Sequence, residues 1–229
     1  MPRFATVLFL AGFAFLLFTL TLTLGFGEPP MRAGQGVLDQ AVAGTGAANA
    51  VSAVLLGFRG LDTLGELSIL FAAATAGGLV LGRRRPPAEG APAGTILQAG
   101  TRLLFPLMLV VGFYIVLHGH LTPGGGFQGG VILAAAFFLP LLAGTGAGPD
   151  HGLLRVVEGL AGTAFILIGL AALWGGGVFL EPLLVRPEAL HELFSAGTLP
   201  LLYLAVGLKV GAELAGLLAH MAHAGGGEA

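Results

Sequence analysis

The sequence contains no cysteine, and charged side chains make up only 10% of its 229 residues. Without cysteine the chain has no disulfide, no thiolate metal site, no iron–sulfur cluster and no cysteine nucleophile, so electron-carrying chemistry within it is not expected. A soluble domain carries about a quarter charged residues. With 55% hydrophobic residues, this chain could not cover its surface with groups that water solvates well. The composition excludes a soluble globule and predicts an integral membrane protein.

Other absences narrow the function. The formal net charge of −2 provides no basic surface for nucleic acid. The forty glycines have no strict three-residue period, which excludes collagen. Because no Ser/His/Asp arrangement, metal-ligand cluster or cofactor motif is evident in the sequence, we expect neither a catalytic site nor a bound metal or cofactor.

Apolar runs that approach the roughly 20 residues needed to cross a bilayer predict an all-α protein with about six transmembrane helices. The first run is longer than a signal-peptide core, so we expect it to be retained. The second spans only if Glu66 is sheltered or lies near an interface, and the fourth reaches span length only if its helix begins inside the preceding glycine run. The six runs are residues 4–25, 63–82, 103–121, 131–144, 153–174 and 194–218.

The basic residues predict the orientation, because cytoplasmic loops hold the excess of lysine and arginine. With six spans, one side receives Arg3, Arg83, Arg84, Arg85, Arg102 and Arg155, and the other receives Arg32, Arg59 and Arg186. We therefore expect a multi-pass protein of the inner (plasma) membrane with both termini in the cytoplasm.

A stretch rich in arginine and proline divides the chain into two halves that do not look alike. It predicts a two-helix segment at 1–82, a cytoplasmic linker at 83–100, a four-helix domain at 101–220 and a flexible tail at 221–229.

The first polar motif is FRGLDTLGE, residues 58–66. Asp62 and Glu66 are four residues apart and share a helix face, so together they could hold a proton or a cation. Alternatively, Thr63 and Glu66 form a capping box, with Asp62 complementing the helix dipole and Arg59 neutralising one acid. Spacing alone leaves both interpretations open.

This motif resembles a stretch near the C-terminal end of the A subunit of Mrp-type multisubunit cation/proton antiporters. It also resembles the E subunit of membrane-bound hydrogenases. The resemblance covers roughly residues 1–82.

The second motif is GHLTPGGGFQGG, residues 119–130. Thr122 and Pro123 are typical of a helix start, and small residues let membrane helices approach closely. A phosphate-binding loop is a poor alternative because the Gly-Lys-Ser/Thr ending is missing. His118 and His120 point to opposite sides of a helix, which favours polar interface residues over metal ligands. The structural motif comprises Pro123, Gly124, Gly125, Gly126, Phe127, Gly129 and Gly130.

The string closely resembles the signature of the B subunit of the same antiporters, also present in the F subunit of the hydrogenases, over roughly residues 95–220. The chain thus looks like an E-like segment fused to a B-subunit domain.

Three further charged residues lie in or beside spans. Glu158 follows Arg155 by three residues, which favours a surface ion pair. Lys209 and Glu213 have i, i+4 spacing near the predicted end of the last span, and either a proton relay or a snorkelling lysine neutralised by its neighbour fits this spacing. Gly207, Gly211 and Ala215 form a small-residue stripe expected to pack against another helix.

The resemblance implies a non-catalytic membrane subunit of a module that exchanges sodium for protons, contributing to assembly and to the ion path. Its partners would be other membrane subunits of an Mrp-like or hydrogenase-type complex, together with the lipid bilayer. The same module in a redox-driven complex and a purely structural scaffold are the alternatives. The candidate ion-path residues are Asp62, Glu66, His118, His120, Glu158, Lys209 and Glu213.

Overall fold

The computed structural model describes residues 2–23, 32–81, 93–144 and 150–225, and every regular element within them is helical. The chain divides into two compact units, residues 1–36 and 37–229. The first unit contains α1 (Pro2–Thr23), which is apolar around its whole circumference. The predicted tail 221–229 is described only as far as Gly225, and most of the predicted linker 83–100 lies outside the described residues.

Four described helices are long and apolar enough to cross a membrane: α4 (Gly60–Leu81), α5 (Thr95–Leu117), α7 (His151–Trp174) and α8 (Leu199–Gly225). A bent pair of helices could form a fifth span. The apolar parts of α1 and of α6 (Gly126–Leu142) are shorter than a full span. The protein is therefore an all-α, multi-pass membrane protein, as predicted.

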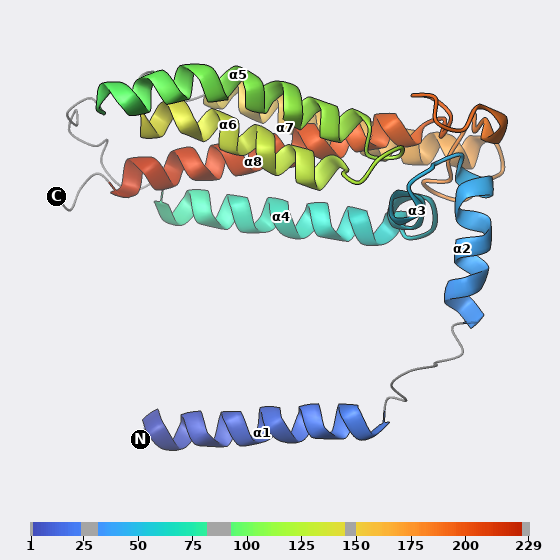
Figure 1. Cartoon of the computed structure of the whole chain (residues 1–229), viewed down its shortest axis with the longest axis horizontal. Helices are drawn as coiled ribbons and strands as arrows, with labels where there is room; N and C mark the ends of the chain where they lie inside the picture. Colours follow the sequence, from blue (N-terminus) through green and yellow to red (C-terminus); the bar gives the residue numbers. More distant parts are fainter. Residues whose placement is uncertain (1, 24–31, 82–92, 145–149, 226–229) are drawn as a thin grey trace. The chain divides into compact units, whose positions relative to one another are not determined.

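Helix α8 is the centre of the second unit. It packs against α4, α6 and α7, while α5 packs mainly on α6, and these helices run side by side in Figure 1. Within its membrane-crossing window 56% of α8 is buried, compared with 6% of α4. Polar groups on α8 are thus the ones most shielded from lipid.

Glycine allows α6 to lie directly on α8. A Cβ added at Gly126 would lie 2.6 Å from the Val206 Cβ, and one at Gly130 would lie 2.8 Å from the Val210 Cβ. On α8, a Cβ at Gly207 would lie 2.6 Å from a Val116 methyl group. The small-residue stripe predicted on α8 is therefore a packing face, and α6 begins inside the glycine run as expected.

A broken helical segment precedes α4 and was not predicted. It consists of α2 (Arg32–Thr45), α3 (Ala50–Ser52) and a π-helical turn, η1 (Ala53–Phe58), and the chain bends by 97° between its two arms. Gly46 has a φ of +63°, a conformation that glycine adopts without strain. Asn49 then caps α3, because its side-chain oxygen accepts from the backbone N–H of Val51 at 3.1 Å.

Two predicted boundaries are wrong. Helix α5 begins at Thr95, so the residues TILQAG, predicted to be part of the linker, form its first turns. Helix α8 begins at Leu199, five residues after the predicted start of the last span, because residues 194–198 form turns that include a φ of +56° at Gly197.

Candidate functional site

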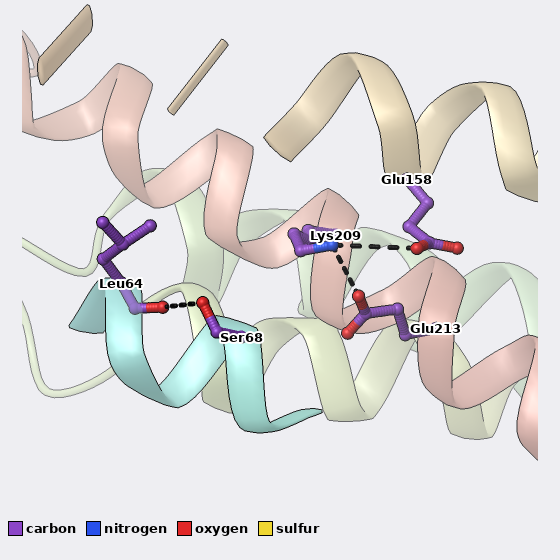
Figure 2. A network of polar contacts seen from close by, with 5 residues as sticks. All are labelled: Leu64, Ser68, Glu158, Lys209 and Glu213. Carbon is purple, nitrogen blue, oxygen red and sulfur yellow. Dashed lines mark hydrogen bonds and ion pairs between the residues drawn. The ribbon is translucent and has the colours of Figure 1, made fainter. Parts of the chain in front are cut away.

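A cluster of three charged side chains lies between α7 and α8. The Lys209 Nζ is 2.5 Å from the Glu213 Oε1 and 3.7 Å from the Glu158 Oε1. Figure 2 shows Lys209 and Glu213 on the same helix, with Glu158 reaching toward the ammonium from α7. The side chains are 13%, 1% and 22% exposed for Lys209, Glu213 and Glu158. The predicted Lys209–Glu213 pair is present, and Glu158 joins it.

The cluster lies near the middle of the span. At 1.5 Å per residue, Lys209 is about 15 Å from Leu199 and about 20 Å from Ala222 along α8. The ammonium lies beside two acids, one of them the neighbour that both predicted interpretations name. The predicted Arg155–Glu158 pair is wrong, because Glu158 faces Lys209 and the Arg155 Nε donates to the His151 carbonyl at 3.3 Å.

The electrostatics of the cluster leave room for one more positive charge. With both carboxylates ionised, one ammonium neutralises only one of them, and an unpaired charge at this depth costs several kcal/mol. The Glu213 Oε2 atom is buried and has no hydrogen-bond partner in the described part of the chain. The Lys209 Nζ also lies 5.0 Å from the centre of the Phe71 ring on α4, a cation–π contact. The arrangement can accept a proton or a monovalent cation.

Two cavities meet at the cluster. The larger, of about 520 Å³, is lined by Glu158 and Glu213 and extends between α4, α7 and α8 as far as His151 and His220. The smaller, of about 350 Å³, is lined by Lys209, Glu158 and Ser68. Phe71, Glu158 and Gly159 line both. Since a water molecule occupies about 30 Å³ in the liquid, both cavities can hold water beside the charged groups.

Asp62 and Glu66 lie one turn apart on α4 and have different surroundings. The Arg59 Nε donates to the Asp62 Oδ2 at 2.6 Å, so Arg59 neutralises one acid as anticipated. The capping box is wrong, because α4 already begins at Gly60 and the Thr63 hydroxyl donates to the Leu55 carbonyl at 3.0 Å. That bond ties α4 to the preceding π-helical turn.

Glu66 is an exposed acid on a helix long enough to cross the membrane. It lines a small cavity of about 50 Å³ together with Gln128 and Tyr203. The Tyr203 hydroxyl is buried and has no hydrogen-bond partner among the described residues. Glu66 therefore remains a second candidate for ion handling, separate from the Lys209 cluster.

The glycine-rich motif forms a junction with the bent segment that precedes α4, and sequence reasoning missed this junction. The Asn49 Nδ2 donates to the carbonyls of Gly119 and Thr122, each at 2.9 Å, and the Ser52 hydroxyl donates to the Gly119 carbonyl. A Cβ at Gly119 would lie 2.6 Å from the Gly125 Cα, so the loop folds closely on itself. The sequence carries no signal for these contacts, because the donors and the carbonyl acceptors are about 70 residues apart in the chain and only the fold brings them together.

His118, just before the glycine-rich motif, and His120, within it, lie in different surroundings. His118 caps α5 and stacks on Tyr114, with ring centres 4.2 Å apart. His120 is fully buried, and burial lowers its pKa, an effect that neighbouring backbone groups of Glu192 and Leu193 partly oppose. Both of its ring nitrogens lack a hydrogen-bond partner within the described part of the chain. No group of three or more potential metal ligands occurs among the described residues.

Comparisons with known proteins identify both halves of the chain. Residues 96–216 match the family described as a domain related to the MnhB subunit of Na+/H+ antiporters, and residues 5–96 match the family described as the E subunit of MBH. An uncharacterised protein of Methanocaldococcus jannaschii is 36% identical in an alignment of 197 residues, with a coverage of 74% of this chain and 74% of that protein.

Two solved structures contain similar chains. A chain of the membrane-bound sulfane sulfur reductase (MBS), an archaeal respiratory membrane complex, superposes with a TM-score of 0.85 and 39% identity, covering 96% of this chain and 97% of that one. A chain of the Mrp complex from Dietzia sp. DQ12-45-1b gives a TM-score of 0.74 with 25% identity, covering 98% of this chain and 26% of that one.

The near end-to-end match with the MBS chain means that the pairing of the two segments is not peculiar to this sequence. The chain belongs to the family of domains related to the MnhB subunit of Na+/H+ antiporters, preceded by a segment that matches the E subunit of MBH.

Proposed function

We propose that the chain is a non-catalytic membrane subunit of an Mrp-type module that exchanges a cation, with sodium as the first candidate, for protons, and that it carries part of the ion path. The observation that carries this proposal is the Lys209–Glu213–Glu158 cluster near mid-span. It has a cavity on either side and a buried carboxylate oxygen that finds no hydrogen-bond partner among the described residues. A scaffold that touched no ion would have no use for three charges at this depth.

The distribution of arginine supports the proposed orientation. Within the second unit, Arg102 and Arg155 lie near the starts of α5 and α7, whereas Arg59 and Arg186 lie in the connections before α4 and α8. In Figure 1, α4 and α8 run in one direction and α5 and α7 run in the opposite direction. By the positive-inside rule, we place the starts of α5 and α7 in the cytoplasm, and with six crossings both termini would lie there too.

The test is sodium-dependent proton movement in vesicles that contain the assembled complex. We expect Glu213→Gln to assemble normally and to lose at least tenfold in transport, because an amide cannot take up a proton. Glu158→Gln should also lower transport. Glu188→Gln, an exposed acid in the turn before α8, is the matched control and should transport normally. Unchanged transport in Glu213→Gln and Glu158→Gln would refute the ion-path role and leave the scaffold.

The parent complex has two candidates. Similarity to a chain of the Mrp complex supports a secondary antiporter, and similarity to a chain of MBS supports a module driven by a redox reaction in partner subunits. Purification from native membranes, followed by mass spectrometry of the co-purifying subunits, separates them. Antiporter subunits alone would establish the first, and iron–sulfur or other redox subunits would establish the second.

A further inference from the structure

Two histidines from different helices meet at the end of the larger cavity. His151 is the first residue of α7, and His220 lies near the end of α8. Their ring centres are 5.2 Å apart, and the ring planes are inclined by 49°. Both line the cavity of about 520 Å³ that reaches Glu158 and Glu213. The pair therefore lies at one end of the cavity and the charged cluster at the other.

The hydrogen bond of His220 defines which nitrogen is free. Its Nδ1 lies 2.7 Å from the Gly216 carbonyl oxygen, and because a carbonyl can only accept, Nδ1 carries the proton. The neutral ring therefore keeps its lone pair on Nε2, the nitrogen available to a proton or a metal ion. Two imidazoles bound to one tetrahedral ion through Zn–N bonds of about 2.0 Å have their ring centres about 5 Å apart. The observed separation of the rings already matches this geometry.

The other groups around the cavity leave this role to the histidines. Helix α7 contributes Arg155 and Glu158, and α8 contributes Glu213. The described cavity residues from α4 are Phe71, Ala74, Thr75 and Gly78, none of which is charged. Arginine does not release its proton at physiological pH, whereas histidine ordinarily exchanges one near neutrality. Among the described residues that line the cavity, His151 and His220 are the imidazole bases, and they lie where α7 begins and where α8 nears its end.

We propose that His151 and His220 form the proton-entry site of the chain, exchanging protons between the solution and water in the cavity that leads to the Glu213 Oε2. A proton taken up at an imidazole nitrogen leaves to the cavity and ends on the carboxylate oxygen, so each histidine returns to its neutral state. Zn²⁺ bound between the two imidazoles would block this entry. This inference rests on the proposed ion path.

The experiment uses Zn²⁺ as the probe on the assembled complex. We expect micromolar Zn²⁺ to inhibit transport when added on the side where α7 begins. His151→Gln and His220→Gln should each raise the inhibitory concentration at least tenfold. Without zinc, the double variant should transport several-fold more slowly, and added imidazole should restore part of the rate. His191→Asn removes an exposed histidine from the connection before α8 and should behave like the wild type.

A second measurement tests the pair without transport. Zn²⁺ titration of the purified complex by calorimetry should show one binding site that the double variant lacks. Unchanged zinc binding in the double variant overturns the site. If the double variant keeps normal transport and zinc sensitivity while Glu213→Gln abolishes transport, protons do not enter at this pair. The proposed ion path would still stand in that case. Normal transport in Glu213→Gln refutes the ion path itself.

Discussion

Lys209 is one cation between two carboxylates, which makes its removal different from the removal of either acid. Lys209→Met would keep most of the side-chain volume but leave Glu158 and Glu213 without this counter-charge. Breaking a buried ion pair on one side costs about 3–5 kcal/mol. We therefore expect Lys209→Met to lower the melting temperature and the yield of the assembled complex. Adding Glu213→Gln should restore assembly but not transport, and a fully stable Lys209→Met complex would contradict the role of the cluster.

His120 makes the junction between α3 and the glycine-rich loop sensitive to acid. The ring is buried and neutral, and burial lowers its pKa below the ordinary histidine value of 6.5. A lowered pKa in the folded state means that the unfolded or undocked chain binds the proton more readily, so stability is full above about pH 6.5 and falls as the pH drops below it. Besides His118, the neighbouring backbone of Glu192 and Leu193 faces the ring.

The expected result is faster hydrogen exchange at Asn49 and Gly119 at about pH 5.5 than at about pH 7.5, on either side of the ordinary histidine pKa. His120→Phe should remove most of this pH dependence, because the replacement cannot be protonated. His191→Asn is the control and should keep it. An identical pH profile in wild type and His120→Phe would assign the sensitivity to another group.

Close packing of α6 on α8 depends on glycine at defined positions rather than on glycine content. A Cβ at Gly130 would lie 2.9 Å from the Gly207 carbonyl oxygen, a backbone atom that cannot move aside alone, whereas Gly100 on α5 has nothing within 4 Å. We expect Gly130→Ala to cost about 1–3 kcal/mol by overpacking and Gly100→Ala to be neutral or slightly stabilising. Melting temperatures of the two variant complexes measure the difference. Equal values would show that α6 and α8 can move apart to accommodate a Cβ at Gly130 without a loss of stability.

Helices were predictable from sequence where one physical rule was sufficient. Long apolar runs identified α1, α4, α5, α7 and α8, and the glycine run identified the start of α6. The same rule missed α2, α3 and η1, because each arm of this bent segment is too short and too mixed to be recognised as a span. Spacing found the Lys209–Glu213 pair on one helix but not Glu158, which comes from another helix and joins only through packing.

The described helices expose many large apolar side chains, which lipid or a partner subunit can cover. One exposed acid, Glu66, limits which of the two covers α4. Glu66 follows the start of α4 by six residues, about 9 Å into the span. An ionised carboxylate facing hydrocarbon there costs several kcal/mol. We therefore expect the Glu66 face of α4 to be covered by a partner subunit. The chain expressed alone should be unstable in mild detergent, and a monodisperse, thermally stable monomer would count against this expectation.

The absence of cysteine makes the covered face directly measurable, because a single introduced thiol can be labelled without background from this chain. Ile69, one turn beyond Glu66 on α4, is 72% exposed in the isolated chain, and Leu103 on α5 is 71% exposed. If a partner covers the Glu66 face, Ile69→Cys should react with a lipid-soluble maleimide in the isolated chain and be protected in the complex. A photoreactive group attached to the thiol of Ile69→Cys should then cross-link to a protein subunit on illumination. Leu103→Cys is the matched comparison, since its reactivity shows whether assembly also covers α5. Equal labelling of Ile69→Cys in the isolated chain and in the complex would place lipid against this face and contradict the expected cover by a partner subunit.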